Sequence, residues 1–247
     1  MPDSPETPPP VAAAGPAATP RVNDTFVARF ERWALPRMAR RLPAWVTPDT
    51  LTVAALVGTG LTAAGYVLAG RSLLWLHVAS LGYVLHWWGD SLDGTLARVR
   101  DIRREKYGFF VDHQADAISS AMIFIALGYG PLMRMDFALA ILTGFLLMMN
   151  LVNMVEIARG VFKISFWGGG PTELRLVMIA VNTAIWAFGN PTRAFWGREW
   201  TAFDQFALAA IPFVFVLYLS SALRETLLIG RLDPRPPPGP NAEPPLR

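Results

Sequence analysis

The chain has 247 residues, of which 53% are hydrophobic and 17% are charged, and its formal net charge is +3. Soluble domains average about 45–50% apolar residues, so this composition favours one integral membrane domain and leaves no room for a second sizeable soluble domain. The chain contains no cysteine, which excludes disulfide bonds, thiol catalysis and cysteine metal sites.

The first segment, residues 1–22, is rich in Pro and Ala and lacks an apolar core of signal-peptide length, so we expect it to be disordered. Residues 23–46 mix bulky apolar side chains such as Phe30 and Trp33 with arginines such as Arg37. This composition is typical of an amphipathic juxtamembrane helix in the membrane interface. A nucleic-acid-binding arm is the competing interpretation, but the aromatic residues and the hydrophobic run that follows argue against a nucleic-acid partner.

Six hydrophobic stretches then follow, each near the length of about 20 residues that crosses a bilayer. We expect these helices near residues 50–69, 72–95, 108–128, 136–157, 172–188 and 203–223. The prediction is an all-α integral membrane protein with six transmembrane helices plus an N-terminal interfacial helix. Its membrane domain would cover residues 47–225, and a flexible Pro-rich tail would cover residues 226–247.

Four aspartates lie at the ends of hydrophobic stretches, where charged residues are not expected. Asp90 and Asp93 close the second stretch, and Asp112 and Asp116 open the third. Charged groups at membrane depth are costly and commonly mark functional sites. The spacings place each pair on one helix face. Since four carboxylates at one membrane face would repel each other without a cation, the pattern predicts a site for Mg²⁺ or Mn²⁺, which prefer hard oxygen ligands.

Glycine and arginine accompany the acids. Gly94 and Gly108 leave room for backbone or ligand to approach closely. Arg98 could donate two parallel hydrogen bonds to a phosphate. Single acids near a helix end are often solvated caps, and Arg98 could be an ordinary cytoplasmic anchor. Taken together, however, carboxylates, a divalent metal, Gly and Arg indicate phosphoryl or phosphodiester transfer on a diphosphate.

The order of these residues resembles the signature of the CDP-alcohol phosphotransferases, also called CDP-alcohol phosphatidyltransferases. It reads Asp90-x2-Asp93-Gly94-x2-Ala97-Arg98-x9-Gly108-x3-Asp112-x3-Asp116. The gap between Arg98 and Gly108 is one residue longer than is usual, so we expect a longer loop with an intact site.

A second motif lies upstream of the acids. The run Pro48-Asp49-Thr50-Leu51-Thr52 is similar to the family's Pro-Asn-x-x-Thr helix start, with Asp49 in place of Asn. This departure bears on any nucleotide contact at position 49. Together the two motifs cover about residues 45–117.

The resemblance implies an enzyme of phospholipid biosynthesis that transfers a substituted phosphate to an alcohol hydroxyl and releases CMP. It implies a metal, Mg²⁺ or Mn²⁺, held by Asp90, Asp93, Asp112 and Asp116. Gly94, Ala97, Arg98 and Gly108 would shape the nucleotide and phosphate site, and Asp116 would also be the general base. It also implies contact with membrane lipids and allows a homodimer.

Two donors are compatible with the resemblance. The preferred version is a phosphatidyltransferase in which CDP-diacylglycerol donates to a small polar alcohol. In the alternative, CDP-choline or CDP-ethanolamine donates to diacylglycerol, and the run Asp112-His113-x-x-Asp116 is similar to that group.

The placement of Lys and Arg predicts the orientation of the chain in the membrane. Basic residues gather before the first stretch, between the second and third, and after the fourth and sixth. The opposite loops carry only Arg71, Arg134, Arg193 and Arg198. Both termini and the four acids are therefore expected on the cytoplasmic side, in what we take to be a bacterial cytoplasmic membrane.

A polar stripe crosses the fourth stretch, where Asn150, Asn153 and Glu156 recur every three residues. Glu173 and Arg175 open the fifth stretch. Because lipid is a poor environment for such groups, we predict that all five line an acceptor pocket. Hydrogen bonding between membrane helices is the alternative.

The three histidines invite a catalytic interpretation that the pattern does not favour. His113 follows Asp112 directly, but neighbouring helical residues point about 100° apart, so a structural role is expected. His77 and His86 lie among aromatic residues and are expected to pack.

A divalent-cation transporter is the competing class, with the four acids as its ion path. The acids cluster toward one face, no polar run continues across the membrane in the sequence, and Arg98 suits an anion better than a cation path. CMP release that depends on Mg²⁺ would distinguish the enzyme from the transporter.

Overall fold

The computed structural model describes residues 26–159, 171–195 and 197–234. The expected disordered segment 1–22 and most of the expected tail lie outside the described residues. The described chain forms helices α1 (Phe26–Arg41), α2 (Pro48–Leu68), α3 (Trp75–Val99), α4 (Glu105–Tyr129), α5 (Met135–Arg159), α6 (Pro171–Phe188) and α7 (Ala202–Leu232), with a short hairpin of β1 (Arg193–Phe195) and β2 (Arg198–Trp200).

Two details differ from the sequence-based expectation. Helix α7 extends past residue 225, where the flexible tail was expected to begin, because leucines and isoleucine continue its apolar character as far as Leu232. The chain is also not purely helical, since β1 and β2 pair as an antiparallel ribbon between α6 and α7. Gly197 turns this ribbon at a φ of +71°, in the left-handed region that glycine adopts readily.

The composition of the helices marks a membrane protein. Within the described ranges, three helices are long and apolar enough to cross a bilayer, namely α2, α5 and α7. The remaining long helices are more polar, because α3 and α4 carry the four aspartates and α6 carries Glu173 and Arg175. The protein is therefore a helical membrane protein, and the count of six spans stays a prediction.

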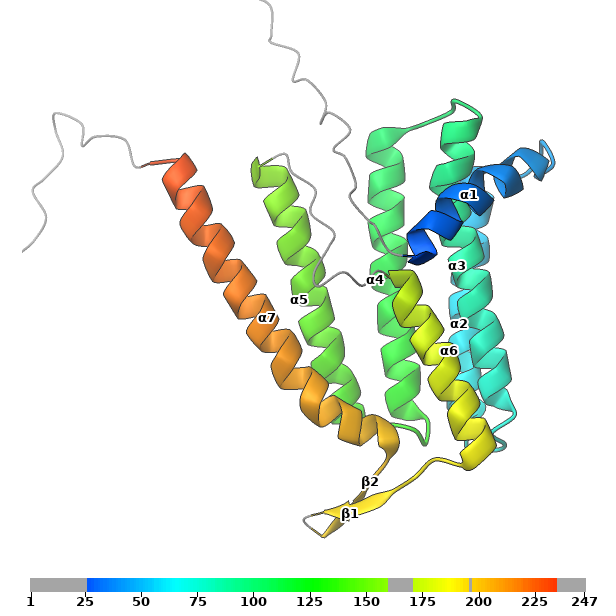
Figure 1. Cartoon of the computed structure of the whole chain (residues 1–247), viewed down its shortest axis with the longest axis vertical. Coiled ribbons are helices and arrows are strands. Elements are labelled where there is room, and N and C mark those ends of the chain that lie inside the picture. The colour runs from blue at the N-terminus through cyan, green and yellow to red at the C-terminus, as the bar shows by residue number, and fades with distance from the viewer. Residues whose placement is uncertain (1–25, 160–170, 196, 235–247) are drawn as a thin grey trace, which may run out of the picture.

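The helices pack side by side around α2, α3 and α4 (Figure 1). Helix α2 packs against α3 and α4, α6 packs against α3, and α5 packs against α4 and α7. Tyr66, Leu76, Leu127 and Phe203 belong to one buried apolar cluster that joins these helices. Helix α1 lies at the end of the bundle where α3 ends and α4 begins, and the β-hairpin lies at the other end (Figure 1).

Small residues bring α2 and α3 unusually close together. A Cβ atom added to Gly58 on α2 would lie 2.5 Å from the backbone N of His86 and 2.7 Å from the carbonyl O of Gly82, both on α3. Close approach of this kind is a common way to pack helices in membranes, where dispersion contacts and not the hydrophobic effect hold helices together. The contact fixes the half of α3 that leads to the acids against α2.

The start of α2 is fixed by its own side chains. Thr50 N donates to Thr47 Oγ1 at 3.2 Å, and Thr47 N donates to Thr50 Oγ1 at 2.9 Å, which forms a reciprocal cap. Pro48 occupies the first turn, where its missing N–H costs nothing. The upstream motif therefore sets the register of α2, including that of Thr52.

The connection between α3 and α4 lies in the stretch where one extra residue was expected to lengthen the loop. It consists of residues 100–104, because α4 begins at Glu105 and already includes Gly108. Asp101 turns the chain at a φ of 55°, a conformation that Asp tolerates better than most residues. Arg100 donates to the carbonyl oxygens of Leu42, Pro43 and Val46 and so ties the turn to the segment that joins α1 and α2. Arg100 thus has a structural partner in addition to its positive charge.

Candidate active site

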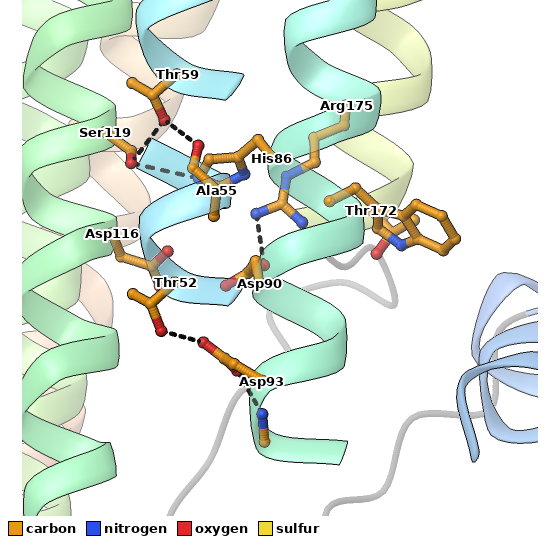
Figure 2. Close-up of polar contacts among 12 residues, drawn as sticks. Thr52, Ala55, Thr59, His86, Asp90, Asp93, Asp116, Ser119, Thr172 and Arg175 are labelled. Atoms are coloured by element: carbon orange, nitrogen blue, oxygen red, sulfur yellow. Dashed lines mark hydrogen bonds and ion pairs between the residues drawn. The ribbon is translucent and has the colours of Figure 1, made fainter. Parts of the chain in front are cut away.

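The four aspartates meet at one end of the bundle. Asp90 and Asp93 project from α3, and Asp112 and Asp116 project from α4, close enough for their negative charges to repel one another. Figure 2 shows Asp116 on α4 facing Asp90 and Asp93 on α3, with the start of α2 beside them. The i,i+3 and i,i+4 spacings therefore bring together the carboxylates that the sequence analysis grouped.

Asp93 is oriented by two donors. Thr52 on α2 donates from Oγ1 to Asp93 Oδ2 at 2.7 Å, and the backbone N–H of Gly94 donates to Asp93 Oδ1. Thr52 is only 9% exposed, so water competes little for this bond. The α2 cap sets the position of Thr52, and the Thr52 hydroxyl connects α2 to the acid cluster.

Asp90 forms an ion pair with a residue from the far half of the sequence. Arg175 Nη2 on α6 lies 2.8 Å from Asp90 Oδ2, and the two side chains are only 12% and 24% exposed. The same guanidinium also acts electrostatically on Asp116. Arg175, which the sequence analysis assigned to an acceptor pocket, therefore lies at the acids.

The donor set fits a hard divalent cation by its chemistry. Four carboxylates supply only oxygen ligands, which Mg²⁺ and Mn²⁺ prefer, and their repulsion gives a cation a favourable place. Each carboxylate oxygen has two lone pairs, so the bonds from Thr52, Gly94 and Arg175 leave ligand positions on Asp90 and Asp93. Among the described residues, however, no three acidic or histidine side chains are already assembled as a metal cage.

The small residues of the signature leave open space. Within the part of the chain that the structure describes, a Cβ atom added at Gly94 or at Gly108 would meet no atom within 4 Å, so packing there does not require glycine at either position. Ala97 lies one turn beyond Asp93 on α3, and Arg98 Nη2 donates to Thr95 Oγ1 at 3.0 Å. This arrangement leaves room for a ligand along the last turn of α3.

The five residues assigned to an acceptor pocket divide between two helix pairs. Asn150, Asn153 and Glu156 lie on α5, which packs against α4 and α7, whereas Glu173 and Arg175 lie on α6, which packs against α3. One turn beyond Glu156, Arg159 forms an ion pair with Glu225 on α7. That pair agrees with the alternative role of the α5 stripe in holding helices together.

Sequence reasoning missed two groups of residues around the site. His86, expected only to pack, joins Ser119 and Thr59 in a buried polar bridge. Glu31 on α1 accepts at Oε1 from Trp87 Nε1 and from Thr172 Oγ1, both at 2.7 Å. For His86 a signal existed, because it precedes Asp90 by four residues and therefore shares its helix face.

These features define a helical membrane protein with a carboxylate-rich site at one end of its bundle, suited to a cation and a phosphate. The family model for CDP-alcohol phosphatidyltransferase matches residues 45–218, and the chain belongs to this family. No curated protein sequence gives a match to the chain. The protein is therefore a transferase of phospholipid synthesis that acts on a CDP-alcohol and an alcohol acceptor in the membrane, in a family that generally uses a divalent metal.

Proposed function

We propose that this enzyme transfers the phosphatidyl group of CDP-diacylglycerol to the hydroxyl of a small polar alcohol and releases CMP. The observation that carries the proposal is the meeting of four aspartates from α3 and α4 beside the Arg175 guanidinium. Negative ligands for a cation and a fixed positive charge at one place suit a diphosphate substrate.

Different residues would bind the metal, the phosphates and the nucleotide of the donor. Asp90, Asp93, Asp112 and Asp116 would hold the metal, which when bound neutralises the diphosphate charge and makes CMP a better leaving group. Arg98, at the last turn of α3, would pair with phosphate oxygens. The open space at Gly94 and Gly108 would admit the nucleotide.

Asp116 would act as the general base. It faces the α3 acids, where an acceptor hydroxyl would meet the phosphate (Figure 2). The carboxylate takes the hydroxyl proton while the alcohol oxygen forms a bond to the phosphorus distal to cytidine. The bond from that phosphorus to the CMP oxygen breaks, which leaves a phosphodiester lipid and CMP.

The contacts of His113 bear on the choice between the two donors. His113 Nδ1 lies 2.8 Å from the carbonyl O of Phe109, and the two rings pack with centroids 4.0 Å apart. The histidine thus has partners within its own helix turn, and its presence beside Asp112 gives little reason to prefer CDP-choline or CDP-ethanolamine as donor.

The test is CMP release by the detergent-purified protein with Mg²⁺. One arm contains CDP-diacylglycerol with a panel of polar alcohols, and the other contains CDP-choline or CDP-ethanolamine with diacylglycerol. Release in the first arm alone, abolished by EDTA, supports the proposal. Release in the second arm alone would mean that CDP-choline or CDP-ethanolamine is the donor. No release together with no CDP binding would refute the proposal that the protein is an enzyme acting on a CDP-alcohol.

The base assignment has its own variant. Asp116→Asn should abolish turnover, because an amide cannot accept the hydroxyl proton, while CDP-diacylglycerol binding is largely retained. Asp101→Asn is the matched control, since Asn also tolerates a left-handed conformation in the α3–α4 turn. Near-normal turnover by Asp116→Asn would show that another group is the base.

A further inference from the structure

A histidine, a serine and a threonine form a buried bridge between three helices. Thr59 Oγ1 on α2 lies 2.9 Å from Ser119 Oγ on α4, and Ser119 Oγ lies 3.3 Å from His86 Nε2 on α3. All three residues are at most 6% exposed. The bridge therefore links α2, α3 and α4 at a point that water does not reach freely.

This bridge lies about one helix turn below the acid cluster, and we call Thr59, Ser119 and His86 the polar floor of the site. His86 precedes Asp90 by four residues on α3, and Ser119 follows Asp116 by three residues on α4. Because an α-helix turns every 3.6 residues, both lie about one turn from the acids, on the side away from the α3–α4 connection. Figure 2 shows His86 with Ser119 on one side and Arg175 and Asp90 on the other.

One nitrogen of this histidine is left over. His86 Nδ1 is buried and has no hydrogen-bond partner among the described residues, which is uncommon for a buried polar atom. Leaving such a group unsatisfied is destabilising, because it loses its hydrogen bonds to water on burial. The contact of Nε2 with Ser119 leaves Nδ1 without a hydrogen-bond partner in the described part of the chain. A bound ligand would supply one.

The order of donors in the bridge sets the character of Nδ1. Thr59 Oγ1 lies 3.2 Å from the carbonyl O of Ala55 and 2.9 Å from Ser119 Oγ. We take the shorter contact as the donated bond, so that Thr59 donates to Ser119 and Ser119 donates its own hydrogen to His86 Nε2. A neutral imidazole carries one N–H, so this order places the hydrogen on Nδ1 and makes it a donor. The ring is buried, and a buried imidazole is expected to be neutral because burial disfavours its charged form.

We propose that His86 binds the acceptor alcohol, with its Nδ1–H donating to the hydroxyl oxygen. This inference rests on the proposed function and adds to it the place of the acceptor. A hydroxyl has one hydrogen and two lone pairs. Its hydrogen would go to Asp116, one lone pair would accept from His86, and the other would attack the phosphorus.

The anionic diphosphate of the donor and the uncharged hydroxyl of the acceptor suit different groups in this site. The diphosphate of the donor is anionic and is matched by Arg98 and Arg175 and by the metal that the acids would hold. The floor offers the uncharged groups of Thr59, Ser119 and His86, which suit an uncharged hydroxyl. The alcohol would therefore contact the floor while the diphosphate lies over the acids.

Two substitutions separate the nitrogens of His86. The side-chain amide of Gln reaches about as far as Nε2, so His86→Gln keeps the contact with Ser119 and loses Nδ1. The amide of Asn lies near the position of Nδ1, so His86→Asn keeps a donor there and loses the contact with Ser119. The pair tests the proposal directly, because a purely structural role predicts that Gln is the better substitute.

The measurement is steady-state CMP release with the donor and alcohol that the wild-type enzyme uses. We expect His86→Gln to lower kcat/KM for the alcohol by about 10- to 100-fold, the effect of losing one to two hydrogen-bond equivalents. The KM for the CDP donor should stay within about twofold, and His86→Asn should recover most of the loss. His77→Gln and His77→Asn are the controls, because His77 lies on the same helix but packs against Trp186.

Several outcomes would overturn the proposed role of His86. Equal losses in Gln and Asn variants that both melt like the wild type, an increase confined to the donor KM, or no change would overturn the inference while the proposed function stands. Should the variants fail to fold, the ¹⁵N signal of His86 Nδ1 in the histidine-labelled wild type must move when the alcohol is added with CMP and Mg²⁺. A wild-type enzyme that releases no CMP with any pair removes the proposed function, and this inference with it, before variants are compared.

Discussion

Replacing Thr52 by valine tests whether the start of α2 controls the acid cluster. Valine has nearly the shape of threonine but cannot donate to Asp93, so the substitution removes the 2.7 Å bond from Thr52 Oγ1 to Asp93 Oδ2. It also removes the bond from Thr52 Oγ1 to the carbonyl O of Pro48 at 3.2 Å. The catalytic carboxylates themselves are unchanged.

The expected magnitude follows from the charge and burial of this bond. Hydrogen bonds to charged groups contribute about 1.5–3 kcal/mol, and Gly94 continues to hold the other oxygen of Asp93. We therefore expect the low end of this range, which corresponds to about a tenfold effect. Substitutions of residues that orient metal ligands typically cost about 10- to 100-fold in metal affinity or activity.

The assay is CMP release as a function of Mg²⁺ concentration. Thr52→Val should need about tenfold more Mg²⁺ for half-maximal activity, with a melting temperature only a few degrees below that of the wild type. Thr183→Val is the matched control, because among the described residues the Thr183 hydroxyl donates within its own helix, to the carbonyl O of Ile179. If Thr52→Val shows the Mg²⁺ dependence of the wild type, the hydroxyl does not orient Asp93 for metal binding.

Two further predictions concern how the site is held in place. Gly58→Ala should destabilise the protein by about 1–3 kcal/mol, the usual cost of overpacking, because its Cβ would meet the backbone of α3. Gly60→Ala, with open space around it, should be neutral or raise the melting temperature, and equal melting of the two variants would contradict the close contact. Glu31→Met should loosen α1, measured as faster proteolysis of α1, since Trp87 and Thr172 both donate to Glu31 Oε1. Glu31→Gln keeps an acceptor oxygen and should resist proteolysis nearly as well as the wild type, whereas equal cleavage of Met variant and wild type would show that the contact is dispensable.

The sequence predicted the helices and the acids well because both depend on local patterns. Apolar length locates α2 to α7 to within a few residues apart from the end of α7, where the apolar run continues beyond the expected boundary. The aspartates share a face because the helical period is 3.6 residues, so Asp90 and Asp93 meet Asp112 and Asp116 once α3 and α4 lie in the same bundle. The cap at Thr47 and Thr50 is likewise a contact between residues three apart.

By itself, then, the sequence determined which residues are helical and which carboxylates share a helix face, since these follow from neighbours within one turn. Only the tertiary structure decided that Arg175 pairs with Asp90, that His86 contacts Ser119, and that Glu31 joins α1 to α3 and α6. These partners lie between 33 and 141 residues apart in the chain. A periodic pattern reports the direction of a side chain on its own helix, whereas its partner depends on which helices pack together and at what height. Close packing of α2 on α3 through Gly58 and Gly82 sets that height, and so brings the polar floor beneath the acids.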